Sequence, residues 1–242
     1  MENLQSDHLD TQNLYRDMQK RTGGEIYIGV VGPVRTGKST FIKRFMDVAV
    51  LPYMEDAAQK TRAQDELPQS AGGRTITTTE PKFIPQEAVE LKLAGEVTIR
   101  VRLVDCVGFM VEGAAGHLED GAERLVKTPW YDHEIPFTQA AELGTRKVIT
   151  DHSTIGVVVT TDGSFSDLPQ ETYLDAENQA ISELKKLHKP FLVLVNSSHP
   201  SSRTAREAAE RIEKQHSVAA MPVNCAQLSE EDIRQIMEQI LY

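Results

Sequence analysis

Eight consecutive residues have the types and spacing of a phosphate-binding loop. Residues 32–39 read GPVRTGKS and fit the pattern GxxxxGK(S/T) at every fixed position. In this pattern, backbone N–H groups at a helix start surround the phosphates, the lysine reaches the outer phosphates and the hydroxyl binds magnesium. We therefore predict Lys38 as the phosphate-binding lysine and Ser39 as a magnesium ligand. The remaining nucleotide contacts predicted in this segment are Gly32, Arg35, Thr36, Gly37 and Thr40.

This pattern has meaning only where a strand leads into it and a helix follows it. Residues 26–31, IYIGVV, are an apolar run typical of a buried strand, and residues 40–46 continue with helical spacing. A chance glycine-rich helix start is the alternative, and it does not account for both flanks. The sequence therefore predicts a strand, a phosphate-binding loop and a helix in succession.

A second candidate site follows the apolar strand predicted at residues 97–105. There Asp105 and Gly108 form a DxxG, DCVG. In P-loop proteins an aspartate at this place holds magnesium and the glycine N–H contacts the γ-phosphate. An aspartate at a strand end can also cap a turn, but its distance after the phosphate loop favours the metal role. We predict Asp105 as a magnesium ligand and Gly108 as a nucleotide contact.

Three threonines lie between these two motifs, at residues 77–79. Nucleotide switches place a threonine here that closes over magnesium and the γ-phosphate. A strand edge with a polar face is the alternative. Thr78 and Thr79 directly precede Glu80 and Pro81, and they are the predicted sensor residues, with Thr79 as a further magnesium ligand.

The base-selecting segment departs from the guanine-specific pattern NKxD. After the apolar run at residues 192–195 the chain reads NSSH, so Asn196 is kept and His199 stands where the aspartate belongs. Without that carboxylate a site loses much of its discrimination for the two donors of guanine. ATP is therefore favoured over GTP. Asn196 is predicted to contact the nucleotide, and a turn cap after the strand is the alternative.

The residue that would orient the attacking water is not evident. Phe109 follows Gly108, where many small GTPases have a glutamine. Arg35 is a candidate for cationic stabilisation, with an exposed surface arginine as the alternative. We predict slow turnover, not well above about 1 s⁻¹. Three acidic residues that follow fit a solvated loop better than a catalytic role: Glu112, Glu119 and Asp120.

The remaining elements predict an α/β fold. Residues 89–93 and 97–105 alternate apolar and polar around a glycine-containing turn, as in an antiparallel hairpin. A helix is predicted at 137–149. Strands and helices then alternate, which indicates a parallel sheet. They are predicted at 155–160 (strand), 172–187 (helix), 191–195 (strand), 204–215 (helix), 218–223 (strand) and 230–241 (helix).

The predicted class is a P-loop NTPase of the translation-factor and Ras-like type, with a mostly parallel sheet, one antiparallel edge strand and flanking helices. Residues 1–22 are expected to form a helical extension and residues 23–242 a single P-loop domain. Long switch-like loops are expected at about 52–80 and 108–136, the second of them extended and mobile.

Composition limits the partners. The chain has 242 residues, of which 40% are apolar and 26% charged, with a net charge of −10. The acidic balance argues against nonspecific nucleic-acid binding. Cys106 and Cys225 each end an apolar run and are expected as buried thiols without a disulfide. Because the first 24 residues are polar and no run approaches the roughly 20 apolar residues of a membrane span, we expect a cytosolic chain. The seven histidines are scattered without paired-ligand spacing, so a structural metal site is not expected.

Longer stretches resemble one family. The segments GVVGPVRTGKSTFIKRFM, TRAQDELPQSAGGRTITTTEPKF, RLVDCVGF and PFLVLVNSSHP resemble stage IV sporulation protein A, the family of morphogenetic ATPases of endospore-forming bacteria. The resemblance covers residues 23–242 and corresponds to the N-terminal ATPase domain. It implies that ATP and Mg²⁺ are bound and ATP is hydrolysed. The catalytic residues it implies are Lys38, Thr78, Thr79 and Asp105.

The resemblance also implies a role and partners. Hydrolysis would drive self-assembly into a homopolymer, the basement layer of the spore coat, in the mother-cell cytoplasm at the forespore outer surface. Other spore-coat morphogenetic proteins and the forespore membrane would be contacted through regions beyond this chain. Two other functions remain open: a regulatory GTPase-type switch that does not polymerise, and a structural protein that binds nucleotide once.

Overall fold

The structure is a computed structural model that describes residues 20, 23–68, 80–93, 97–114, 118–119 and 121–241. Apart from residue 20, the predicted helical extension at 1–22 lies outside these residues. So do Thr78 and Thr79, and Asp120.

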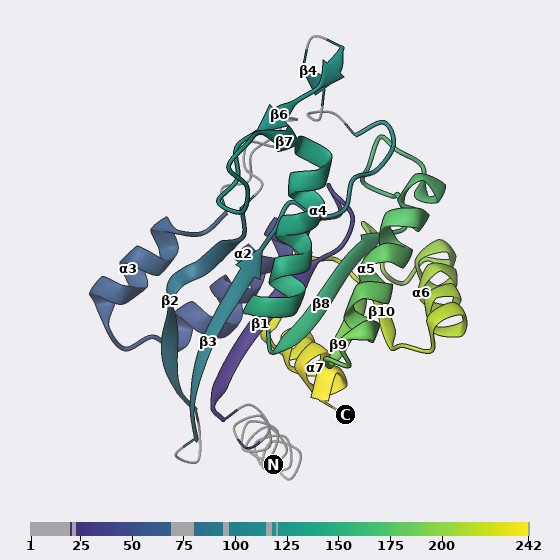
Figure 1. The fold of residues 1–242 in the computed structure, drawn as a ribbon. Helices are drawn as coiled ribbons and strands as arrows, with labels where there is room; N and C mark the ends of the chain where they lie inside the picture. Colours follow the sequence, from purple (N-terminus) through teal and green to yellow (C-terminus); the bar gives the residue numbers. More distant parts are fainter. Residues whose placement is uncertain are drawn as a thin grey trace.

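A six-stranded sheet forms the centre of the molecule, in the order β10-β9-β8-β1-β3-β2 (Figure 1). Neighbouring strands are parallel except β2 and β3, which pair antiparallel at one edge. The predicted sheet, including its antiparallel edge strand, is therefore confirmed. The strands are β1 (Glu25–Val31), β2 (Lys82–Leu93), β3 (Val97–Asp105), β8 (Ile155–Thr161), β9 (Phe191–Asn196) and β10 (Ala220–Val223).

Helices cover both faces of the sheet (Figure 1). In β1, Ile26, Ile28 and Val30 pack in one apolar cluster with α2 and α7, while Val31 packs in the other with α5 and α6. Because both faces are covered, the central strands are nearly continuous apolar runs. The helices are α2 (Lys38–Phe45), α3 (Ala57–Asp65), α4 (Phe137–Lys147), α5 (Leu174–Lys186), α6 (Arg203–His216) and α7 (Glu230–Leu241).

Four short helical segments complete these elements. Two are π-helical and directly extend α2 and α4, and two are 3-10 turns. They are η1 (Met46–Val50), η2 (Leu51–Tyr53), η3 (Val148–His152) and η4 (Gln170–Tyr173).

The segment at 108–136 differs from the predicted loop, because four strands of two residues each lie within it. They form two antiparallel pairs, β4 with β5 and β6 with β7. A two-residue strand is too short to produce a visible alternation of apolar and polar residues, so these strands could not be predicted from the sequence. The strands are β4 (Leu118–Glu119), β5 (Ala122–Glu123), β6 (Leu125–Val126) and β7 (Ile135–Pro136).

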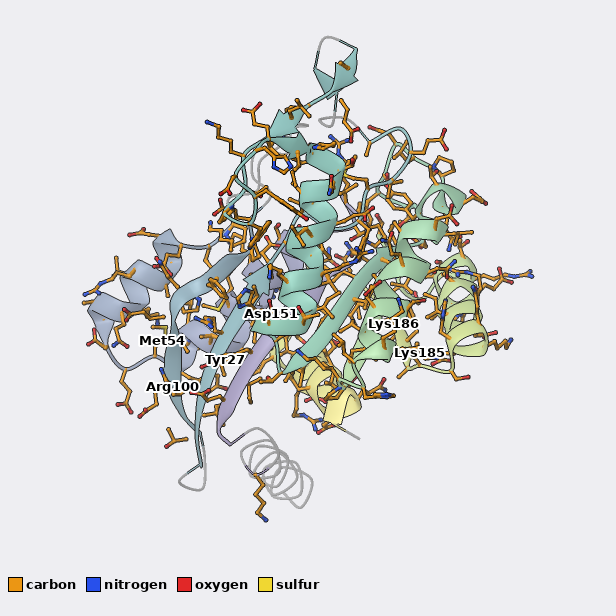
Figure 2. All side chains as sticks on the ribbon, in the orientation of Figure 1. Tyr27, Met54, Arg100, Asp151, Lys185 and Lys186 are labelled. Carbon is orange, nitrogen blue, oxygen red and sulfur yellow. The ribbon has the colours of Figure 1, made fainter. Side chains whose placement is uncertain are left out.

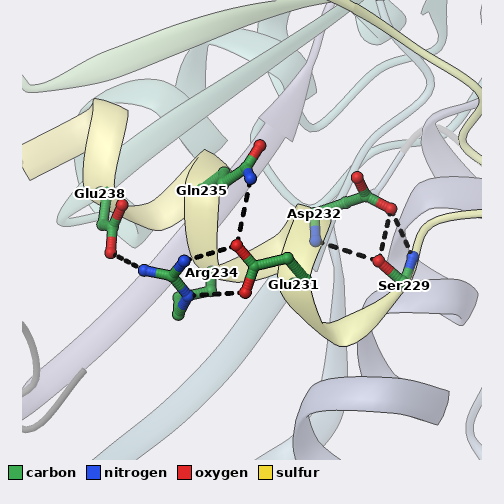
Figure 3. A network of polar contacts seen from close by, with 6 residues as sticks. All are labelled: Ser229, Glu231, Asp232, Arg234, Gln235 and Glu238. Carbon is green, nitrogen blue, oxygen red and sulfur yellow. Dashed lines mark hydrogen bonds and ion pairs between the residues drawn. The ribbon is translucent and has the colours of Figure 1, made fainter. Parts of the chain in front are cut away.

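Charged and polar side chains define the helix ends. Before α7, the backbone N–H of Ser229 donates to Asp232, and the backbone N–H of Asp232 donates back to Ser229 Oγ (Figure 3). This reciprocal pairing satisfies N–H groups that the helix itself leaves unpaired. On the same helix Arg234 lies between Glu231 and Glu238 (Figure 3).

Both cysteines, Cys106 and Cys225, are buried and free, as predicted. Burial raises the pKa of the Cys106 thiol to about 11 and that of Cys225 to about 12. Both thiols are therefore protonated at neutral pH and serve as small apolar groups. Within the described part of the chain, none of the helices combines the length and the apolar character that crossing a membrane requires.

Two histidines are expected to make stability depend on pH. Burial lowers the pKa of His152 and of His216, whose Nε2 lies 2.8 Å from Asn178 Oδ1. His216 is the last residue of α6, and its backbone oxygen accepts from Lys185 at the end of α5, where Lys186 also lies (Figure 2). As the pH falls through about 6.5, the unfolded chain binds these protons more readily than the native protein, so native stability decreases.

Urea unfolding between pH 7.5 and 5.5 measures this dependence. The free energy of unfolding should fall toward pH 5.5, and His216→Gln should reduce the slope because one of the two groups is removed. A slope that the substitution leaves unchanged would assign the pH dependence to other groups.

Candidate functional site

The phosphate loop lies where β1 ends, between its neighbours β3 and β8. Gly32 has φ +132°, and a Cβ built on it would lie 2.3 Å from the backbone oxygen of Val159. Both the backbone conformation and the close approach of β8 therefore require glycine. Thr36 Oγ1 donates to the same Val159 oxygen at 2.6 Å, which attaches the loop to the sheet.

Lys38 opens α2 with its side chain directed back along the loop. It is only 5% exposed, and Nζ donates to the backbone oxygen of Pro33 at 2.6 Å. Burial lowers the pKa of the ammonium, and the nearby Asp105 carboxylate opposes this effect. A buried ammonium inside a ring of loop backbone can hold the outer phosphates of a nucleotide.

Ser39 and Asp105 meet across the gap between α2 and β3. Ser39 Oγ donates to Asp105 Oδ2 at 2.8 Å, and the Cys106 N–H donates to Asp105 Oδ1 at 2.9 Å. Burial raises the pKa of Asp105, while the Ser39 hydrogen bond and the Lys38 ammonium lower it. The structure thus brings Asp105 to Lys38 and to Ser39, from which it is 66 residues away in the sequence.

These residues fit a magnesium ion. Mg²⁺ takes oxygen ligands and is commonly held by one or two protein side chains together with substrate phosphates. The Ser39 hydroxyl and the Asp105 carboxylate are such a pair. When bound, the ion would supply positive charge that neutralises the phosphates. Thr79, the third predicted ligand, lies outside the described residues.

Asn196 has a role that neither sequence interpretation included. Its Nδ2 donates to the backbone oxygen of Thr36 at 2.9 Å, and its Oδ1 accepts from the Cys225 N–H at 3.0 Å. The side chain is 7% exposed. Asn196 therefore joins the phosphate loop to the connection between β10 and α7. Its predicted contact with the nucleotide stays a prediction.

His199 lies beside this bridge. It lines a cavity of about 430 Å³ between the connections that follow β8 and β9. The other walls are mostly hydroxyl and small side chains, among them Ser164, Ser197 and Thr204, together with the carboxylate of Asp162. Among the described residues that line this cavity, none is a lysine or an arginine.

Phe109 is fully buried among apolar side chains that include Val31, Val34 and Val111. Its backbone N–H donates to Gly32 O at 3.0 Å, and its oxygen accepts from the Val34 N–H at 2.9 Å. Phe109 therefore attaches the DxxG segment to the phosphate loop. At this position there is therefore no polar side chain that could orient the attacking water molecule.

Three further residues that the sequence analysis named lie at the surface. Glu112 and Arg35 are exposed, and Arg35 has a left-handed backbone with φ +62°. Thr40 is also exposed, in the first turn of α2. Two groups that the motif analysis did not select contact the site: Val159 and Thr145, whose hydroxyl accepts from the Gly108 N–H. Nothing local in the sequence marks either of them.

The parallel sheet, the strand–loop–helix at residues 25–45 and the Lys38, Ser39 and Asp105 cluster define a P-loop nucleotide-binding α/β protein. Residues 9–242 match the family model described as stage IV sporulation protein A, ATPase domain. The chain therefore belongs to the stage IV sporulation protein A family, and the resemblance seen in the sequence is confirmed.

Two relatives show how similar the chain is. Stage IV sporulation protein A of Clostridioides difficile (strain 630) is 50% identical over 230 residues, which cover 95% of this chain. The protein of the same name from Bacillus subtilis (strain 168) is 45% identical over 234 residues, or 97% of this chain. The chain spans about half the length of these relatives, 47% and 48%.

Solved structures are more distant. A crystal structure of SsGBP with GDP is 13% identical, covers 89% of this chain and 49% of that one, and has a TM-score of 0.49. The family assignment therefore depends on the sequence relatives, and the fold assignment on the sheet and its helices.

Proposed function

We propose that this chain binds ATP with Mg²⁺, hydrolyses it slowly, and uses hydrolysis to assemble with further copies of itself. The observation that carries the nucleotide part is the convergence of Lys38, Ser39 and Asp105 at the end of β1. The match to an ATPase domain over residues 9–242 supports ATP as the substrate class.

The reaction proposed is in-line attack of water on the γ-phosphate. The Lys38 ammonium and the N–H groups of the loop stabilise the charge that develops on the transferring phosphoryl group, because the fold fixes their positions beforehand. Thr36 and Asn196 hold the loop in place for this purpose. Thr78 and Thr79 are proposed to close over the γ-phosphate.

Preference for ATP over GTP is proposed from His199. A guanine site needs a carboxylate for the N1 and N2 hydrogens, and a histidine cannot accept both. Slow turnover is proposed from Phe109, because its buried ring takes the place of a water-orienting side chain.

The biological role is proposed from the relatives, which are named for sporulation. The chain would act in the mother-cell cytoplasm at the forespore outer surface, as part of a spore-coat basement layer. Other coat morphogenetic proteins and the forespore membrane would bind regions of the longer relatives outside the matched span.

Assembly through sheet edges is the less suitable route. At one edge, β10 is short and contains Pro222, which cannot donate to a ladder. At the other, β2 carries a register shift between Ile84 and Val89 and charged residues such as Glu87 and Glu90. Both devices discourage pairing between strand edges of different molecules. We therefore propose that copies meet through helices and loops.

Turnover of ATP and GTP by the same sample, followed by sedimentation, tests the function. We expect ATP to be hydrolysed in preference to GTP at a rate below about 1 s⁻¹, with more protein in the pellet when ATP is present. A GTP preference with a soluble monomer would favour the regulatory switch instead. Binding of ATP without measurable turnover would favour the structural protein that binds nucleotide once.

A further inference from the structure

Thr145 is a polar residue in the last turn of α4, on the buried side of the helix, where apolar packing would be expected. It is fully buried, between the helix and the segment that follows β3. Its Oγ1 donates to the Ala141 backbone oxygen one turn earlier, at 2.8 Å. Thr145 Oγ1 also accepts a hydrogen bond from the backbone N–H of Gly108 at 3.2 Å. The hydroxyl thus joins α4 to the glycine of the DxxG.

Gly108 lies between Thr145 and the phosphate loop. A Cβ built on it would be 2.6 Å from Lys38 Nζ and 2.3 Å from Gly32 O, so its Cα packs directly on the lysine that would hold the outer phosphates. In the structure the Gly108 N–H lies against two groups of this protein, the Thr145 hydroxyl and the Cys106 sulfur. In P-loop proteins the N–H of this glycine contacts the γ-phosphate, so a nucleotide held by Lys38 would supply a further acceptor.

The Thr145 hydroxyl is a weaker hydrogen-bond acceptor than a γ-phosphate oxygen. The bond to Thr145 is neutral and, at 3.2 Å, at the long end of the range for N–H donors. A hydrogen bond to a phosphate oxygen is charge-assisted, shorter and about twice as strong. A γ-phosphate would therefore take the Gly108 N–H from Thr145, whereas a nucleoside diphosphate has no oxygen at this place.

The neighbouring residue restricts what can move. Phe109 is fixed by two backbone hydrogen bonds, to Gly32 and Val34, and by its buried ring. The DxxG segment cannot leave the phosphate loop without breaking these contacts. A change of acceptor is therefore confined to the peptide group between Val107 and Gly108, which carries the Gly108 N–H, and α4 is the element released on the other side.

We propose that Thr145 is a positioning residue whose hydroxyl competes with the γ-phosphate for the Gly108 N–H, so that the hold on α4 depends on whether ATP or ADP is bound. This rests on the proposed function. Thr145 lowers the affinity for ATP without affecting that for ADP, and it makes α4 the helix that reports the γ-phosphate to the rest of the molecule.

The test compares two affinities in matched variants. Thr145→Val keeps the branched shape but removes the hydroxyl acceptor, so the Gly108 N–H is left with the weakly accepting Cys106 sulfur until a γ-phosphate arrives. The affinity for a non-hydrolysable ATP analogue should rise about five- to tenfold, and that for ADP should not change. Thr145→Ser keeps the hydroxyl and should restore the wild-type ratio. Thr150→Val removes an exposed hydroxyl that bonds to Arg146 O and to the Asp151 side chain, and it should also give the wild-type ratio.

Other results would overturn the proposal. If Thr145→Val weakens both nucleotides equally, the hydroxyl serves folding alone. An unchanged ratio shows that no competition exists. If the wild-type protein binds neither nucleotide, the proposed function itself fails, and that outcome is separate from the other two.

A second measurement does not depend on how well the valine variant folds. In the wild-type protein, the amide resonance of Gly108 should differ between the ADP complex and the complex with the ATP analogue. In Thr145→Ser, the Gly108 amide resonance of the ADP complex should differ from that of the wild-type ADP complex, whereas the complexes with the ATP analogue should give the same Gly108 resonance in both proteins. A Gly108 amide that is insensitive to both changes contradicts the proposal.

Discussion

Replacing Lys38 by alanine should lower ATP turnover by about 100-fold or more while leaving the fold intact. A preorganised donor to the reacting phosphate typically contributes about two to three orders of magnitude to the rate. The ammonium is buried, and burial lowers its pKa, so the protein bears a cost for keeping the charge there. Removing the charge removes that cost, and the variant should therefore melt near the wild-type temperature.

The matched control is Lys43→Ala. Lys43 lies on the same helix, is half-exposed and pairs with Asp47 four residues on, which is a surface ion pair of small effect. Steady-state ATP turnover and thermal unfolding should be measured for both variants. Wild-type turnover in the Lys38 variant would refute the assignment of the phosphate loop. A loss in both variants would point to damage of α2 instead of loss of the ammonium.

Much of the fold could be predicted because its signals are local. The apolar runs at 155–160 and 191–195 are separated by a stretch of helical spacing, and chirality leaves a parallel sheet as the arrangement that buries them. The P-loop was predictable for a related reason. It binds phosphate through backbone groups, whose geometry depends on glycines at fixed positions such as Gly32.

The contacts that complete the site have no local signal. Asn196 joins Thr36 across 160 residues and Cys225 across 29, and Thr145 joins Gly108 across 37. These pairs are set by which strands neighbour one another in the sheet, and no spacing in the chain encodes that order. The sequence could show that Asn196 follows a strand, but not that both ends of its amide are already bonded within the protein.

The role of Phe109 could also be predicted only in part from the sequence. Its position after Gly108 correctly indicated that no glutamine is present, and hence a slow reaction was predicted. The sequence could not show that the ring is buried or that the Phe109 backbone bonds to the phosphate loop on both sides. Phe109, which stands where a catalytic glutamine would be, thus holds the DxxG segment to the phosphate loop through two backbone hydrogen bonds.

Replacing Asn196 by alanine should destabilise the protein by about 2 to 6 kcal/mol and weaken ATP binding. The amide donates to Thr36 O and accepts from the Cys225 N–H, and its removal leaves both groups buried without partners, at about 1–3 kcal/mol each. Because Thr36 belongs to the phosphate loop, part of the loss should appear as nucleotide affinity. Urea unfolding and ATP-analogue binding measure the two effects.

One further variant separates the two hydrogen bonds of the Asn196 side chain, and a second variant serves as its control. Asn196→Asp keeps the acceptor for Cys225 but loses the donor to Thr36 and brings a negative charge toward the phosphates, so it should weaken ATP binding more than it weakens the fold. Asn178→Ala is the control, since its amide oxygen accepts from Gln215 Nε2 on α6, far along the chain from the loop. It should leave ATP affinity unchanged. If Asn196→Asp binds ATP as tightly as the wild type, Asn196 does not position the phosphate loop, and the predicted role of this residue must be abandoned.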